Sequence, residues 1–462
     1  MNKRTALALL ATLALAGPWQ ARAEELTEEQ IQQIIEKAKP YIEAEVQRRV
    51  KEELEKQKAT ERVAAPAPTP TPVAEPKPWT PSQPIPLFRA GPAYMNISFD
   101  SLINFGWSTE PEGLLNLGGH DPAQRGFSLS NEEIVFEGAV DPYFKGVADI
   151  VMSLDEDGET AVELEEVYIL TTSLPWSLQL KGGQFFTEFG RHNAQHPHQW
   201  AFVDQPLVLN RLFGPDGMRN PGARLSWLAP TPWFTEALLT VFNGQGETAF
   251  SFRNEESIEI HGGEPVERGL RGPQDLVFVP RLATSFELGE TQSILLGASA
   301  AFGPNNSGRH ACTQIYGGDF YWKWRPENAE AGFPFVSWQT EGIFRRYEAD
   351  DRMTPDDPPG SAVPLPDENL HDWGIYSQLL WGFHRGWVAG MRGEFVSGDD
   401  GKFESDLRVD RTRLSPNLTF YPSEFSKLRL QYNYDHLQQW GDEHSVWLQL
   451  EFLLGAHAAH KF

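Results

Sequence analysis

Apolar and polar side chains alternate at every second position along most of the chain after Tyr94. The clearest case lies near the carboxyl end, where every second residue from Val446 to Leu454 is apolar and the residues between them are more polar. Such alternation predicts a β-strand with one apolar and one polar face. The run is long enough for a tilted strand to cross a bilayer. A half-buried strand of a soluble sheet is the alternative interpretation of this stretch on its own.

The same alternation recurs and predicts sixteen strands, at 94–107, 125–140, 143–154, 161–172, 177–189, 221–228, 234–243, 278–288, 292–303, 313–325, 335–347, 371–382, 387–397, 408–421, 426–436 and 444–456. Short and long connections alternate between them, as in a membrane barrel with turns at one end and loops at the other. We therefore predict an all-β fold, in which residues 93–462 form a transmembrane antiparallel β-barrel of about 16 strands. An even number of strands brings both barrel ends out on the same side, which we expect to be the periplasm.

The polar face of these strands is the predicted lining of a water-filled pore. It carries a set of cationic side chains: Arg224, Arg281, Arg345, Arg392, Arg411, Arg413, Lys427 and Arg429. A guanidinium group stays charged and binds oxyanions, so an interior lined in this way favours anions. The alternative is that the arginines pair with interior acids, which would leave only weak selectivity. The acids considered for this pairing are Glu341, Glu394, Asp410 and Asp435.

The connection 190–220 is too apolar for a loop in water, and long loops with their own apolar residues are usually functional. We predict that it folds into the barrel and narrows the pore. Its candidate constriction residues are Arg191, Arg211, Arg219, Trp200 and Phe202. It also contains His192, His196 and His198. Imidazole is a ligand for zinc or copper, but a plain polar loop explains these histidines as well, and we expect neither a bound metal nor another cofactor.

Three segments precede the predicted barrel. Residues 1–23 have the charged start, short apolar core and small-x-small ending of a signal peptide. Residues 24–62 have one apolar stripe on a charged helix, which predicts either a periplasmic coiled coil or a single solvated amphipathic helix. Residues 63–92 are rich in proline and predict an extended, semi-rigid linker.

The composition and the motifs of the sequence argue against several classes of protein. The net charge of −25 argues against binding to nucleic acid, which requires a basic surface. Aromatic residues make up 12% of the chain, yet beyond the first 20 residues no apolar run is long enough for a membrane helix. Aromatic richness of this kind suits the girdles of a membrane barrel. The sequence contains neither a GxSxG nucleophile elbow nor an HExxH metal motif, so we do not expect an enzyme.

Five sequence segments resemble the phosphate-selective porin O and P family of bacterial outer-membrane β-barrels. They are YFKG at Tyr143–Gly146, ELEEVYI at Glu163–Ile169, GGQFFTEFGR at Gly182–Arg191, HPHQWAFVDQP at His196–Pro206 and FGPDGMRNPGARLSW at Phe213–Trp227. The resemblance implies a sixteen-stranded porin of the outer membrane, assembled as a homotrimer, with an amino-terminal coiled segment in the periplasm.

Two functions from different classes follow from these observations. The first is passive diffusion of small hydrophilic solutes across the outer membrane, with a leaning toward anions such as phosphate-like oxyanions. The second is a structural tether, in which the amino-terminal segment binds peptidoglycan and the barrel is an anchor in outer-membrane lipid. Conductance in planar bilayers separates the two.

Overall fold

A computed structural model describes residues 83–455, apart from 111–117, 123, 155–157, 255–257, 357, 400, 404 and 406–407. The predicted signal peptide, the predicted helical segment 24–62 and most of the proline-rich linker lie outside the described residues. These three assignments therefore stay predictions.

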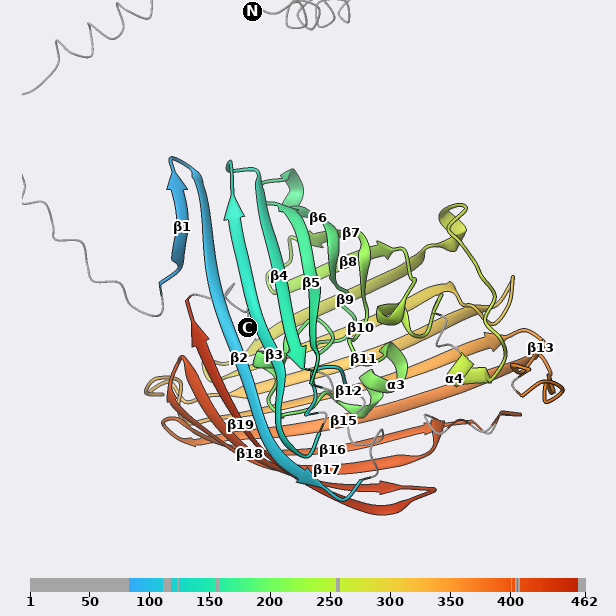
Figure 1. Ribbon diagram of the computed structural model, residues 1–462. Helices are drawn as coiled ribbons and strands as arrows, with labels where there is room; N and C mark the ends of the chain where they lie inside the picture. The colour runs from blue at the N-terminus through green and yellow to red at the C-terminus, as the bar shows by residue number, and fades with distance from the viewer. Residues whose placement is uncertain are drawn as a thin grey trace, which may run out of the picture. The chain divides into compact units, whose positions relative to one another are not determined.

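Sixteen long strands form one antiparallel sheet that closes on itself (Figure 1). They are β2 (Ala93–Ser108), β3 (Gly126–Ala139), β4 (Phe144–Leu154), β5 (Thr160–Thr171), β6 (Leu178–Phe186), β7 (Arg219–Leu228), β8 (Phe234–Phe242), β9 (Val277–Leu288), β10 (Gln292–Pro304), β11 (Cys312–Trp324), β12 (Phe335–Ala349), β15 (Glu368–His384), β16 (Trp387–Gly398), β17 (Arg411–Ser423), β18 (Ser426–Leu437) and β19 (Gly441–Leu454). The ring closes where β19 pairs with β2, from Phe99–Leu454 to Ser108–Ser445. Each predicted strand coincides with one of these, so the predicted barrel is confirmed.

Three shorter strands accompany the ring. Strand β1 (Ile85–Ala90) pairs with the first residues of β2, beyond the point that β19 reaches. Part of the stretch predicted as linker is therefore a strand. Strands β13 (Arg352–Met353) and β14 (Pro364–Leu365) form a small hairpin within the loop that follows β12.

Most connections at one end of the barrel are short, and the longest ones lie at the other end. Strands β15 and β16 are joined through Arg385–Gly386, and β17 and β18 through Glu424–Phe425. At the opposite end, residues 187–218 join β6 to β7 and residues 243–276 join β8 to β9. The first strand of the ring begins and the last one ends at the short-turn end, as the predicted even number of strands requires.

The outer surface of the barrel is apolar. On β18, Leu428, Leu430 and Tyr432 are exposed, whereas the alternating residues Arg429 and Gln431 are buried. The predicted assignment of faces is correct for this strand. An outward apolar surface of this kind is what a barrel surrounded by hydrocarbon requires. None of the helices among the described residues is long and apolar enough to cross a membrane.

The interior holds short helices and a hydrophobic core. Helix α3 (Leu207–Phe213) lies inside the barrel, and α4 (Ile258–His261) belongs to the loop between β8 and β9. Single 3-10 turns occur at Pro175–Ser177, Pro197–Gln199, Glu247–Ala249 and Pro273–Asp275.

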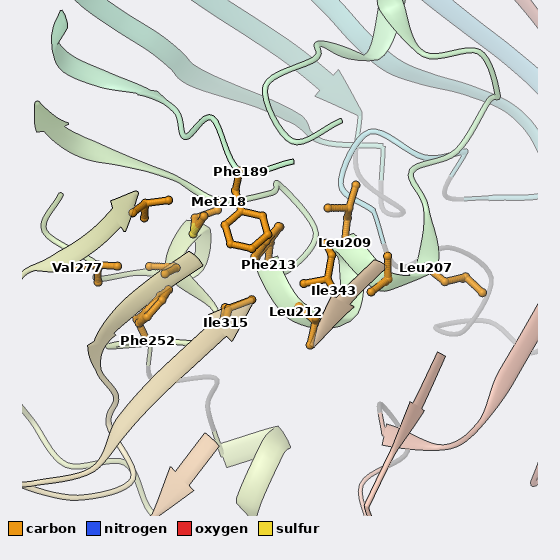
Figure 2. Packing of buried hydrophobic residues seen from close by; sticks show 14 of the residues in the cluster. Phe189, Leu207, Leu209, Leu212, Phe213, Met218, Phe252, Val277, Ile315 and Ile343 are labelled. Atoms are coloured by element: carbon orange, nitrogen blue, oxygen red, sulfur yellow. The ribbon is translucent and has the colours of Figure 1, made fainter. Parts of the chain in front are cut away.

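Figure 2 shows the core in which α3 packs against inward-facing residues of the wall, including Ile315 and Ile343. A Cβ atom at Gly374 of β15 would lie 2.8 Å from Cγ2 of Val208, so this glycine lets the helix approach the wall closely. Each apolar side chain fully buried there contributes about 1.5–3 kcal/mol.

Candidate functional site

Residues 187–218, called the folded-in segment below, run inside the ring of strands between β6 and β7. The segment lies inside because its apolar side chains are buried there. Trp200, Phe202 and Val203 are at most 5% exposed and share the interior with helix α3. Apolar residues inside a membrane barrel have no lipid to face, so they bury one another across the lumen. The segment therefore lies inside the barrel, and its role as a constriction stays a prediction.

Asp204 ties the middle of the folded-in segment to the wall. Its Oδ1 accepts a hydrogen bond from Nη2 of Arg392 at 2.6 Å, and its Oδ2 accepts one from Nη1 of Arg413 at 2.7 Å. Gln431 and Asn433 donate to the same carboxylate at 2.8 and 3.1 Å. Burial raises the pKa of Asp204, but Arg392 and Arg413 lower it further, so the net shift is downward. The side chain is therefore ionised at neutral pH.

Backbone carbonyl groups of the segment meet the same side of the barrel. Nη2 of Arg429 donates to the carbonyl of Trp200 at 2.7 Å, and its Nη1 donates to that of Phe202 at 3.0 Å. Nζ of Lys427 donates to the carbonyl of His198 at 2.7 Å. We call the cationic residues of β16–β18 that hold the segment the basic wall; they are Arg392, Arg413, Lys427 and Arg429.

The start of the segment is fixed by backbone donors. The amide of Gly190 donates to Oγ of Ser299 at 3.1 Å, and the amide of His192 donates to Oε1 of Glu341 at 2.9 Å. Gly190 has a φ of 62°, and a Cβ atom there would lie 2.1 Å from Oε2 of Glu341. This φ favours glycine, and a side chain at the position would also push the Glu341 carboxylate aside. Next to it, the guanidinium of Arg191 stacks on Tyr321, 4.1 Å from the ring centroid.

The other predicted cationic residues are buried as well, and all of them except Arg211 contact a carboxylate. Arg281 is bound to Asp319 at 2.6 Å, Arg345 to Asp372 at 2.7 Å and Arg411 to Asp435 at 2.8 Å. Arg224 contacts Glu188, and Arg219 contacts Glu163. Arg211 donates to the carbonyl of Arg408 at 3.3 Å. The structure thus shows the paired arrangement, and the role of these residues in lining a pore stays a prediction.

The part of the interior next to the basic wall, beyond β19, is acidic. Strands β2–β5 present five buried carboxylates to the folded-in segment, here called the acidic cluster: Asp100, Glu133, Asp149, Glu165 and Glu166. His196 contacts Glu165 at 2.9 Å and Glu166 at 3.1 Å, and His198 contacts Glu133 at 3.1 Å. Burial lowers the pKa of His196, but the surrounding glutamates outweigh burial and raise it well above its usual value.

The acidic cluster was not found from the sequence. Its residues come from four strands, and only the pairing of those strands brings them together; Asp100 stands opposite Glu133, and Asp149 opposite Glu166. The sequence did contain one sign of it: each of four successive strands carries an acidic residue at a position that the alternation assigns to the interior. His192, by contrast, lies apart from this cluster. It packs against Trp200 and Tyr376, with ring centroids 5.4 and 6.0 Å away.

Comparison with known proteins gives one relative in sequence and several in fold. The chain is 33% identical over 369 residues to an uncharacterized protein of Aquifex aeolicus (strain VF5), covering 75% of this chain and 73% of that protein. The chain belongs to the family of this Aquifex aeolicus protein. No family model matches the sequence.

Among solved structures, the outer-membrane channel DcaP of Acinetobacter baumannii is similar, with a TM-score of 0.53 and 10% identity over 79% of this chain and 99% of that one. The anion-selective porin of Comamonas acidovorans has a TM-score of 0.46 and 8% identity over 78% of this chain and 100% of that one. The likeness to DcaP shows that the fold is that of an outer-membrane channel barrel. The narrower resemblance to phosphate-selective porins stays a prediction.

Proposed function

We propose that the protein is a porin of the bacterial outer membrane through which small hydrophilic solutes diffuse passively, with the folded-in segment as its constriction. One observation carries the proposal. Inside a closed sixteen-stranded ring, the segment is bonded to the basic wall of β16–β18 through Asp204 and contacts the acidic cluster of β2–β5 through His196 and His198. A segment anchored to the wall at two places within a lumen limits the size of the solutes that pass.

A weak preference for anions is part of the proposal. Buried guanidinium groups such as those of Arg392 and Arg429 support it, because a guanidinium binds oxyanions such as phosphate through a planar fork. Their pairing with carboxylates, for example Arg281 with Asp319, argues for a modest preference. We propose, as further parts of the same hypothesis, a homotrimer and an amino-terminal segment in the periplasm.

Planar-bilayer recording of the purified full-length protein tests the function. We expect discrete conductance steps, and reversal potentials in potassium chloride and potassium phosphate gradients displaced toward the anion potential. Barrels shown to be folded by heat-dependent migration on electrophoresis that give no conductance steps would contradict the porin and favour a tether to peptidoglycan. A reversal potential displaced toward potassium would contradict the anion preference alone. Chemical cross-linking in detergent, with three chains expected in the largest product, tests the trimer.

A further inference from the structure

A compact group of ligand atoms lies where the folded-in segment meets the acidic cluster. His196, Glu133, Asp149 and Glu165 each offer one nitrogen or oxygen atom, and these atoms all lie within 4.8 Å of one another. The histidine comes from the segment, and the carboxylates come from β3, β4 and β5. The group therefore joins the segment to three successive strands of the wall.

The spacing of these atoms fits a bound cation. Nδ1 of His196 lies 2.9 Å from Oε2 of Glu165, 3.4 Å from Oδ2 of Asp149 and 3.6 Å from Oε1 of Glu133. Four ligands at about 2.1 Å from a tetrahedral zinc ion are about 3.4 Å from one another. A single imidazole N–H, in contrast, cannot form good hydrogen bonds to three carboxylates at once.

The hydrogen-bond partners of His196 and Glu165 are arranged like those found around the ligands of metal ions. Nε2 of His196 lies 3.1 Å from Oε2 of Glu166, and Oε1 of Glu166 accepts a hydrogen bond from the amide of Phe186 at 2.8 Å. Oε1 of Glu165 lies 3.1 Å from Nε2 of His120. A carboxylate on the far nitrogen of a histidine fixes the ring orientation and leaves the near nitrogen to bind a metal.

The cluster also has more acceptors than the protein satisfies. Asp149 is 2% exposed, and its Oδ1 has no hydrogen-bond partner among the described residues. In the described part of the chain, the five carboxylates contact three imidazole rings, and Lys181 lies 3.9 Å from Glu166. Lys427 also acts on Asp100, but it is paired with Glu451. With this pair included, carboxylates still outnumber these cationic groups when every imidazole is protonated. Buried like charges are expensive unless a cation lies among them.

We propose that His196, Glu133, Asp149 and Glu165 bind a divalent transition-metal cation, and that zinc occupies the site. One imidazole and three carboxylates suit zinc in donor type and number. The cation joins the folded-in segment to β3, β4 and β5, and it balances the charge that the histidines leave uncompensated. The sequence alone favoured a plain polar loop for these histidines, because it did not show which carboxylates surround them.

The test measures zinc binding directly and is independent of conductance. The full-length protein is unfolded in urea with a chelator, refolded into detergent with zinc chloride, desalted and analysed for metal. We expect about one zinc per chain in the wild type. Asp149→Asn and His196→Gln should lose it, and Glu166→Gln should bind zinc about 10- to 100-fold more weakly, since it only orients the ligand. His192→Gln, in the same segment but outside the group, is the matched control and should keep it. His436→Gln removes an exposed histidine next to Asp442 and should also keep it.

A second measurement covers the case in which a variant folds poorly. Without metal, Asp149→Asn removes one of the crowded charges, so its melting temperature should be at or above that of the wild type. Added zinc should raise the melting temperature of the wild type and leave that of Asp149→Asn unchanged. The proposal is overturned if the refolded wild type binds no zinc. It is equally overturned if Asp149→Asn and His196→Gln both retain zinc, or if only His436→Gln loses it.

Discussion

Asp204 and Arg392 are joined twice, once through the carboxylate and once through the backbone. Nη2 of Arg392 donates to Oδ1 of Asp204 at 2.6 Å, and Nη1 donates to the carbonyl oxygen of the same residue at 2.9 Å. Both residues are 1% exposed. Breaking a buried ion pair by removing one partner typically costs about 3–5 kcal/mol, because the other charge is left without compensation. The pair therefore contributes strongly to keeping the segment in the lumen.

Replacing Asp204 with asparagine should loosen the folded-in segment. The substitution keeps the shape of the side chain but leaves Arg392 and Arg413 without their shared carboxylate. In bilayers we expect larger and noisier conductance, and in detergent we expect faster proteolysis within 187–218. Asp442→Asn, at an exposed position, is the control. Conductance and proteolysis equal to those of the wild type would show that Asp204 does not hold the segment.

Deleting residues 194–210 should both widen the channel and increase its preference for anions. The deletion removes Asp204 and the carbonyl groups of Trp200 and Phe202, which are partners of Arg392, Arg413 and Arg429. These guanidinium groups would then face water with their charge less compensated. We expect higher single-channel conductance and a reversal potential displaced further toward chloride. A shorter control deletion of 358–362, in the loop between β12 and β15, should change neither. An unaltered reversal potential would place the three arginines away from the conducting path.

Reversing the charge of Arg413 should impair folding. Its guanidinium lies 2.8 Å from Asp435 and 2.7 Å from Asp204, and the residue is 2% exposed. Arg413→Glu would bury three carboxylates together, and we expect little protein to reach the folded form that migrates fast in unheated electrophoresis samples. Arg385→Glu, in an exposed turn, should fold normally. If Arg413→Glu folded as well as that control, the position would be solvated and available to set ion selectivity directly.

The pH dependence of stability should contain a contribution from His192. Burial, with Arg392 and Arg191 nearby, lowers the pKa of His192 to about 3 from its ordinary 6.5. Below pH 6.5 the unfolded chain takes up a proton at this residue that the folded protein does not, so the free energy of unfolding falls as the pH falls toward 3. The slope from one such proton approaches about 1.4 kcal/mol per pH unit.

His192→Gln should therefore lose less stability than the wild type between pH 6 and pH 4, as measured by urea unfolding in detergent. His384→Gln, at an exposed position, is the control and should follow the wild type. Parallel curves for wild type and His192→Gln would mean that the imidazole is protonated in the folded protein.

The sequence was sufficient for the barrel because strand parity is a local property. Leu428 and Leu430 are apolar and the intervening Arg429 is charged, and this contrast alone assigns the two faces of β18. The small strand β1 was missed because Pro84, just before it, and Pro86, within it, continue the composition of the linker. Its strand conformation comes with its pairing to the first residues of β2, from Ala93 to Ile97, and no local pattern shows that pairing.

The candidate site could be predicted only in part. The apolar residues Trp200 and Phe202 correctly indicated a segment that leaves water, but not which wall it contacts. Whether Arg392 faces solvent or Asp204 depends on the path of that segment, and no local pattern encodes the path. The acidic cluster could not be predicted from the sequence for a related reason. Asp100 and Glu133 become neighbours only through strand register, which a single sequence does not specify.

The closing pair of the ring, β2 with β19, joins positions as distant in the chain as Ser108 and Ser445. Contacts of such long range form slowly, since a long stretch of chain must first be brought together. The folded-in segment touches β2 and β3 through His198, and β16 and β17 through Asp204, which lie on the two sides of this seam. It thus ties the two edges of the unfinished wall together from within. Substitutions or deletions in the segment should consequently slow the assembly of the barrel. Newly made chains would then convert more slowly to the closed form.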